Sequence, residues 1–145
     1  MDIPGRGFST PVTWGEKMFL TTAIPQGAPP AAPEGGGGGR RGAGGGAGPL
    51  VDHKFQVMCL DRRTGKLLWE QTAKTATPHE GYHQAYGSFA SNSPITDGKR
   101  LYVTTPFAFV YALDIDSGKK LWESKMPGPM RAPPAVSDGR IFAIT

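Results

Sequence analysis

The chain repeats itself, and this repetition constrains the fold more than any other feature of its 145 residues. Three segments start at proline, carry an aromatic residue eight positions later and close on threonine: PVTWGEKMFLTT from Pro11, PITDGKRLYVTT from Pro94 and PAVSDGRIFAIT from Pro134. A second element occurs twice, as VMCLDRRTGKLLWE from Val57 and VYALDIDSGKKLWE from Val110. Repeats of this kind predict one structural unit that is built several times.

Each repeated segment has the pattern of a β-hairpin. Short runs of apolar, β-branched and aromatic residues flank D-x-x-[ST]-G turns and the turn dipeptides Trp14-Gly15, Asp97-Gly98 and Asp138-Gly139. In a D-x-x-[ST]-G turn the aspartate accepts hydrogen bonds from the amides that follow it, and the glycine tolerates positive φ. We therefore predict structural rather than catalytic roles for the repeat residues Asp61, Thr64, Gly65, Trp69, Asp114, Ser117, Gly118 and Trp122.

Two hairpins make a four-stranded unit, and the repeat spacing matches one blade of a β-propeller. From Pro94 to Pro134 the repeat spans 40 residues, whereas from Pro11 to Pro94 it spans 83 because of insertions. We predict an all-β fold, a partial propeller domain over residues 1–145 made of two antiparallel blades and the first hairpin of a third. The predicted parts are a blade over 9–72 with an insertion at 23–54, an inter-blade loop over 73–90, a blade over 91–123 and a hairpin over 131–145. A closed propeller needs about four blades or more, so we expect a fragment of a longer protein.

The second repeated element resembles a known family motif. CLDRRTGKLLW from Cys59 and ALDIDSGKKLW from Ala112 are similar to the A-x-D-x-x-T-G-x-x-x-W tryptophan-docking repeat of the pyrroloquinoline-quinone-type (PQQ-type) propellers. Cysteine replaces alanine in the first copy and serine replaces threonine in the second. The resemblance covers about 10–22, 55–72 and 91–145, and it implies that Trp69 and Trp122 each bury an indole against a neighbouring blade.

The resemblance includes both quinoprotein dehydrogenases and non-catalytic scaffolds similar to the outer-membrane-protein assembly lipoprotein. The dehydrogenases typically add a vicinal cysteine pair, a Ca²⁺-binding Glu/Asn set and a catalytic aspartate, whereas this chain has one cysteine, Cys59, and no acidic residue that matches such a site. We therefore expect a non-enzymatic protein-binding or assembly scaffold without a cofactor in this chain. The alternative is a fragment of a PQQ-dependent oxidoreductase whose PQQ and Ca²⁺ site lies in other blades. The resemblance implies a periplasmic or otherwise extracytoplasmic location, although the chain shows no signal peptide.

Residues 79–83 spell HEGYH, which matches the H-E-x-x-H signature of zinc peptidases. That chemistry requires a helix, because only a helix places histidines four residues apart on one face. Pro78, Gly81 and Gly87 disfavour a helix here, and the stretch has no amphipathic stripe. We predict no metal site, and we interpret this segment as a loop whose candidate binding residues are His79, Tyr82, His83 and Tyr86.

Both insertions are expected on one face of the propeller. Strands alternate in direction within a blade, so the links from second to third strand and from blade to blade leave the same face. The insertions at 23–54 and 73–90 are both links of this kind, which predicts a protein-binding face there. Residues 27–50 are rich in glycine and offer almost nothing apolar to bury, so we predict that they are disordered.

Charge distribution and hydropathy argue against nucleic-acid binding and against a membrane-spanning segment. The net charge of +4 comes from basic residues scattered along the chain, whereas a nucleic-acid surface needs them clustered on one face. No apolar run approaches the length of a membrane span. We therefore expect neither a nucleic-acid partner nor a membrane-spanning segment.

Overall fold

The computed structural model describes residues 2–27, 51–78, 88–128 and 133–144, and all the regular structure in these ranges is β-strand. The strands are β1 (Val12–Trp14), β2 (Lys17–Pro25), β3 (His53–Asp61), β4 (Leu67–Ala76), β5 (Ile95–Thr96), β6 (Arg100–Thr105), β7 (Phe109–Asp114), β8 (Lys120–Lys125), β9 (Ala135–Ser137) and β10 (Arg140–Phe142). No helix in the described ranges is long and apolar enough to cross a membrane.

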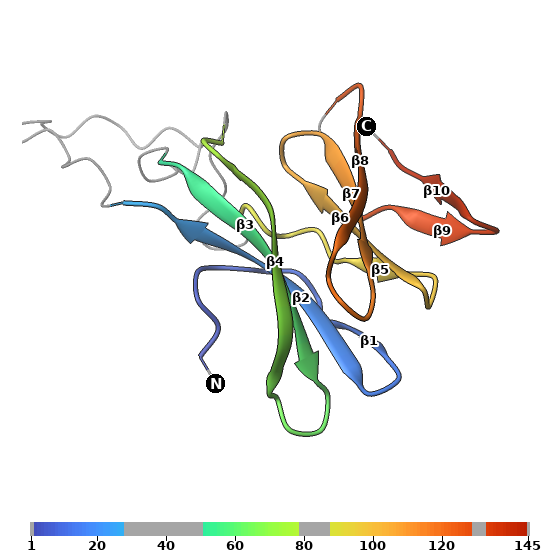
Figure 1. Ribbon diagram of the computed structural model, residues 1–145. Helices are drawn as coiled ribbons and strands as arrows, with labels where there is room; N and C mark the ends of the chain where they lie inside the picture. Colours follow the sequence, from blue (N-terminus) through green and yellow to red (C-terminus); the bar gives the residue numbers. More distant parts are fainter. Residues whose placement is uncertain (1, 28–50, 79–87, 129–132, 145) are drawn as a thin grey trace, which may run out of the picture.

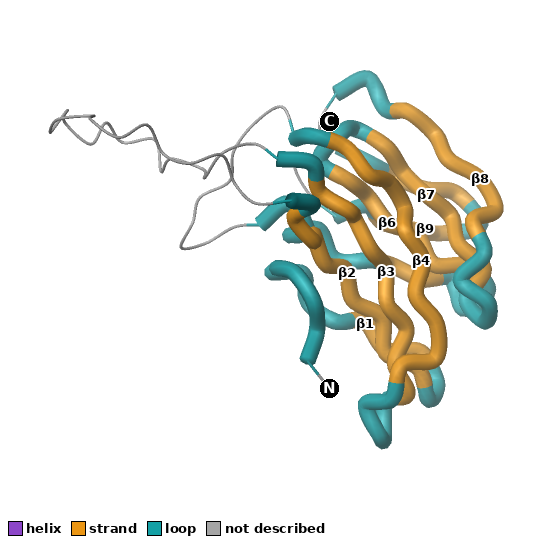
Figure 2. The backbone as a smooth tube through the Cα atoms, turned by 60° about the vertical axis from the view of Figure 1, so that its left-hand side comes forward, coloured by secondary structure: helices purple, strands orange, loops and turns teal. Residues whose placement is uncertain are grey.

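The strands form two four-stranded antiparallel meanders and one hairpin (Figure 1). The first sheet has the order β1-β2-β3-β4 and the second the order β5-β6-β7-β8, while β9 pairs with β10. This arrangement confirms the predicted all-β fold of two blades and the first hairpin of a third. The two blades pack face to face, so that their strands run side by side in Figure 2.

The predicted boundaries of two segments, the insertion and the inter-blade loop, differ from the observed strand boundaries. β4 continues to Ala76 and so takes the first residues of the range 73–90 that the sequence assigned to an inter-blade loop. β2 continues to Pro25 and β3 begins at His53, so both strands extend into the predicted insertion at 23–54. Backbone pairing extends these strands past the residues that contribute to the apolar core, because every residue from Lys17 to Pro25 has a partner in β3. Residues 28–50, predicted to be disordered, lie outside the described residues.

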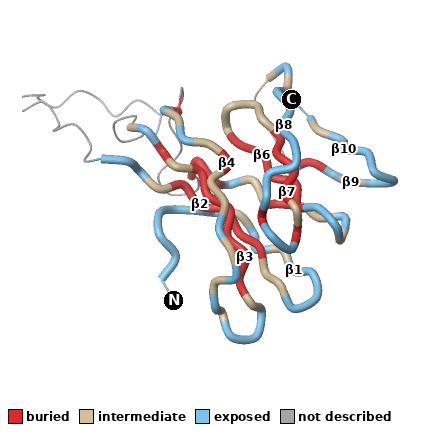
Figure 3. Tube along the Cα trace, viewed as in Figure 1, coloured by how far each residue is buried: buried red, intermediate tan, exposed pale blue. Residues whose placement is uncertain are grey.

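The main core lies between the two blades, where Figure 3 shows the buried residues of the facing sheets. The first blade contributes Phe19, Val57, Cys59 and Ala73, and the second contributes Leu101, Val103, Tyr111, Leu113 and Ile115. Burial raises the pKa of the Cys59 thiol to about 11, so the side chain stays protonated and packs as a small apolar group.

A β-bulge recurs at the same repeat position in both blades. In the first blade Cys59 pairs with Trp69 but Leu60 pairs with Leu67, which leaves Leu68 as the extra residue. In the second blade the equivalent pairs leave Leu121 as the extra residue. Both leucines stay about half exposed, while the bulge shifts the tryptophan that follows each of them by one position along the strand. The sequence pattern gave no sign of these bulges.

Candidate functional site

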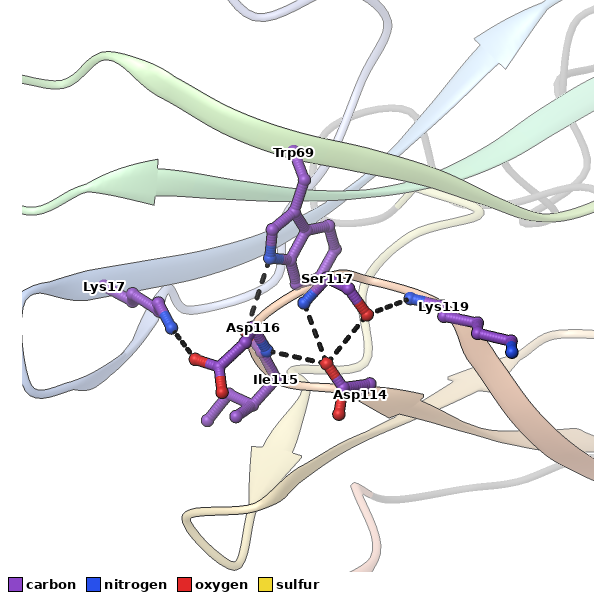
Figure 4. Close-up of polar contacts among 7 residues, drawn as sticks. All are labelled: Lys17, Trp69, Asp114, Ile115, Asp116, Ser117 and Lys119. Atoms are coloured by element: carbon purple, nitrogen blue, oxygen red, sulfur yellow. Dashed lines mark hydrogen bonds and ion pairs between the residues drawn. The ribbon is translucent and has the colours of Figure 1, made fainter.

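The two D-x-x-[ST]-G turns have the same hydrogen bonds. Asp61 Oδ1 accepts from the backbone amides two and three residues later, at 3.0 and 2.7 Å, and from the Thr64 hydroxyl at 2.8 Å. Asp114 Oδ1 accepts from the corresponding amides at 3.1 and 2.8 Å and from the Ser117 hydroxyl at 2.8 Å (Figure 4). Each carboxylate therefore stabilises its own turn, and its Oδ1 atom is already hydrogen-bonded within that turn.

These hydrogen bonds make the two turns sensitive to acid. The Thr64 side chain lowers the pKa of Asp61 from its ordinary value of 3.8, and the Ser117 amide and hydroxyl lower the pKa of Asp114 from the same value. A carboxyl whose pKa is lower in the folded state contributes stability above its unfolded pKa, and this contribution is lost as the pH falls through the folded pKa. Carboxyl NMR titration should therefore find both groups below 3.8. Thr64→Val should raise the pKa of Asp61 and leave that of Asp114 unchanged. A wild-type Asp61 that titrates at its ordinary value would contradict this prediction.

The tryptophan of the first blade docks on the turn of the second blade. The Trp69 indole donates from Nε1 to the Ile115 carbonyl at 3.3 Å, and its ring lies against Gly118. A Cβ at Gly118 would sit 2.5 Å from that ring, so only glycine leaves room for it. Lys17 adds an ion pair to Asp116 of the same turn (Figure 4). We call this contact of Trp69 with the turn at 114–118 the interblade clasp.

The second tryptophan of the repeat contacts no such turn in the part of the chain that the structure describes. Trp122 is 40% exposed and packs in a tilted orientation on Tyr102 of its own blade, with the ring centroids 6.1 Å apart, as Trp69 packs on Phe19 at 5.9 Å. The neighbouring blade expected to bury Trp122, within this chain or just beyond Thr145, is not among the described residues, so that burial remains a prediction. A clasp needs the D-x-x-[ST]-G turn of the following blade, and the chain contains two such turns, both of which precede Trp122. The turn of the first blade is equally open, since a Cβ at Gly65 would meet nothing within 4 Å.

A second contact joins the inner hairpins of the blades. Trp14 is the last residue of β1 and pairs with Lys17, so the hairpin loop is Gly15-Glu16 rather than the predicted Trp14-Gly15. The Trp14 ring lies over Gly98, where a Cβ would come within 2.5 Å of it. The sequence predicted Trp14 only as part of a turn, because no periodic pattern connects it with a glycine far along the chain.

The link end of the blades carries a hollow of about 310 Å³. Its lining includes the last residue of β2, Pro25, and the first residue of β3, His53. This end of the two strands lies opposite the tight turns of the first blade in Figure 1. Three chain segments line it: the N-terminal stretch, the ends of β2 and β3, and the stretch before β5. The lining residues are Gly5, Arg6, Ala23, Pro25, His53, Ser88 and Phe89. The hollow therefore lies on the face that the sequence predicted to bind proteins.

Two of the polar lining residues are held in place by their neighbours. Arg6 pairs with Ala23 through two backbone hydrogen bonds of 3.0 Å, which fixes the N-terminal stretch along β2. His53 Nδ1 lies 2.7 Å from the Val51 carbonyl, so it donates a hydrogen bond to that oxygen. The His53 ring also meets Phe89 edge-on at 4.7 Å. These residues could not be predicted from the sequence because no motif marks them.

The remaining predicted binding residues cannot be placed against this hollow. His79, Tyr82, His83 and Tyr86 lie outside the described residues, and the prediction that HEGYH is not a metal site remains a prediction. Within the described ranges, no three His, Cys, Asp or Glu side chains lie together in a way that could hold a metal ion.

The fold and the clasp define a class of protein. Four-stranded meander blades, joined by a tryptophan of one blade on the D-x-x-[ST]-G turn of the next, are the construction of a PQQ-type β-propeller. A family model described as outer membrane protein assembly factor BamB matches residues 37–145, and the chain belongs to that family.

Curated relatives and a solved structure are similar to parts of the chain. Outer membrane protein assembly factor BamB of Moranella endobia (strain PCIT) is 33% identical over 96 residues, which cover 61% of this chain and 22% of the relative. The factor of the same name from Yersinia pestis is 29% identical over 94 residues, covering 65% of this chain and 23% of the relative. The crystal structure of BamB from Moraxella catarrhalis matches with a TM-score of 0.43 and 18% identity, over 67% of this chain and 28% of that one. The chain thus spans 22–28% of the length of these proteins.

Proposed function

We propose that this chain is part of a non-enzymatic scaffold for the assembly of outer-membrane proteins, and that it binds a partner protein through its link face. The observation that carries the proposal is the hollow at the link end, which three segments far apart in the sequence line together. Family membership supports the class of partner, because the matching relatives are described as outer membrane protein assembly factors. The same relationship supports a location on the periplasmic side of the outer membrane.

The chemistry of the hollow suits a protein partner. Its volume of about 310 Å³ is at the lower limit for a small-molecule pocket, but it is sufficient for one large anchoring side chain. Ala23, Pro25 and Phe89 give it apolar walls, and Arg6 and His53 place a guanidinium group and an imidazole at these walls. An aromatic or aliphatic side chain of the partner would contact the apolar walls, and an acidic group or a backbone amide beside it would contact the polar lining residues. We therefore expect the partner to insert an apolar anchor that is flanked by polar main chain.

Charge reversal in the host cell tests the proposal with a matched control. Arg6 and Arg63 are both exposed arginines, but Arg6 lines the hollow whereas Arg63 lies in the tight turn at the other end of the first blade. Deletion of the gene is expected to lower the amount of folded outer-membrane β-barrel protein, and Arg6→Glu should reproduce most of that loss because it replaces the cation at the partner's contact. Arg63→Glu should behave as wild type. Folded barrels are measured by their altered gel mobility before heating. The proposal fails if Arg6→Glu, present at the normal amount, supports wild-type levels of folded barrels.

A further inference from the structure

A second, much smaller cavity of about 10 Å³ lies between the two blades. Residues of β2, β3 and β4 of the first blade line it together with residues of β6 of the second blade and of the stretch before β5. Its lining contains no charged residue of the described ranges. A cavity of this size is at the lower limit for one water molecule and is far too small for an organic ligand.

The Thr105 hydroxyl lies at this cavity without a hydrogen-bond partner in the part of the chain that the structure describes. Thr105 is the last residue of β6 and is 2% exposed. It lies on the same face of β6 as Val103, which packs in the core between the blades, because alternate residues of a strand share a face. The Tyr111 phenol is close enough to interact with this hydroxyl, but not in hydrogen-bonding geometry. Buried hydroxyls in proteins are nearly always paired with a protein group or an ordered water.

The first blade contains an equivalent hydroxyl that has a partner. Thr22 occupies the same repeat position as Thr105, since each of them closes its repeated segment. Thr22 Oγ1 donates to the Pro4 carbonyl at 2.6 Å, so the N-terminal stretch supplies the acceptor. Thr105 has no such carbonyl within the described ranges. Its acceptor oxygen must therefore come from another source, and the cavity has room for one.

The first blade interrupts its backbone pairing at the same cavity. The pairing of β3 with β4 changes register between Phe55 and Gln56, which leaves Ala73 as the extra residue of a β-bulge. Ala73 is buried and lines the cavity. The extra residue of a bulge is left out of the regular ladder, so its backbone polar groups need other partners. The first blade thus adds polar backbone to the cavity that Thr105 lines from the second blade.

We propose that this cavity binds one water molecule, which accepts a hydrogen bond from the Thr105 hydroxyl and donates to the backbone of the first blade at the Ala73 bulge. The Thr21 hydroxyl lines the same cavity and donates to Ser9 at 2.9 Å, so its oxygen can still accept a hydrogen bond from the water. These groups supply the roughly two to four polar partners that an internal water requires. The water is a hydrogen-bonded link between the blades at the end of β6, separate from the interblade clasp.

Crystal structures of the full-length protein and of two variants at position 105 test the proposal. The wild type should show one ordered water within about 3.2 Å of Thr105 Oγ1. Thr105→Val has nearly the same shape but no hydroxyl, so this water should be lost. Thr105→Ser is the matched control, because it keeps the hydroxyl and should keep the water.

Thermal unfolding of the same protein gives an independent measurement, because its sign separates a hydrated cavity from a dry one. If a water satisfies the Thr105 hydroxyl, Thr105→Val removes hydrogen bonds between the blades and should lower the Tm by about 2 °C. If the hydroxyl is unpaired in a dry cavity, valine removes a buried unsatisfied group and the Tm should rise.

Four results would overturn the proposal. The first is a cavity without ordered density in a wild-type crystal structure that resolves other buried waters. The second is a protein group that accepts the hydrogen bond of Thr105 in place of a water. The third is a water that stays in the Thr105→Val structure, since Thr105 would then not be its partner. The fourth is a higher Tm for Thr105→Val than for the wild type.

Discussion

Replacement of Trp69 by alanine is expected to lower the free energy of unfolding by about 3 kcal/mol, at the lower end of the cost of large-to-small aromatic changes in cores. The indole packs against Phe19 and the main core, covers Gly118 and satisfies the Ile115 carbonyl. Its removal leaves a cavity between the blades and an unpaired acceptor beside it. The effect should be large because one side chain provides both the apolar contact and the hydrogen bond of the clasp.

Urea unfolding followed by far-ultraviolet circular dichroism measures this loss without depending on the tryptophan that is removed. Trp122→Ala is the matched control, since Trp122 occupies the same repeat position but contacts no turn of another blade within the described ranges. It should cost less than about 1 kcal/mol. If the two variants lose equal stability, the position in the repeat rather than the clasp determines the cost.

A second large effect is expected from alanine at Gly118, and Gly65 provides an unusually close control. The two glycines have φ of +71° and +70°, so alanine introduces the same backbone strain of about 1–2 kcal/mol at each. At Gly118 the added Cβ would also lie 2.5 Å from the Trp69 ring, whereas at Gly65 it would meet nothing within 4 Å. Overpacking of this kind costs about 1–3 kcal/mol more. Gly118→Ala should therefore be the more destabilising variant by that difference.

The combination with Trp69→Ala separates the two causes at Gly118. In a Trp69→Ala background the ring is gone, so Gly118→Ala should cost no more than Gly65→Ala. Thermal or urea unfolding of the four single and double variants gives the coupling between the two positions. Independent, additive effects of Trp69→Ala and Gly118→Ala would contradict the predicted steric clash between the Trp69 ring and a Cβ at residue 118.

Much of the fold was predictable from local chemistry. The D-x-x-[ST]-G segments form the predicted turns because Asp61 and Asp114 satisfy the amides within three residues of themselves. The hairpin at Asp138-Gly139 likewise follows from two residues that both adopt positive φ, 48° and 72°. Strand bounds were less predictable, because pairing with a neighbour extends β2 and β4 beyond the residues that the apolar pattern marks.

The candidate site was predictable only as a face. Topology alone places the link after β2 and the link before β5 at one end, and the hollow lies there. Its residues escaped prediction because Arg6, His53 and Phe89 come together only when the N-terminal stretch pairs with β2. The predicted binding residues His79, Tyr82, His83 and Tyr86 remain a prediction.

The sequence by itself determined the repeat, the all-β meander and the family. Each of these depends on short stretches of chain, in which nearby side chains form the hydrogen bonds and the apolar pattern of the turns and strands. Only the tertiary structure decided which tryptophan is docked. Trp69 and Trp122 occupy the same place in the motif, yet the Trp69 hydrogen bond reaches the Ile115 carbonyl, 46 residues further along the chain. Trp122 is 40% exposed because no turn of a following blade lies over it among the described residues. A local pattern specifies what a side chain can contact, but packing between blades decides whether the contact is made.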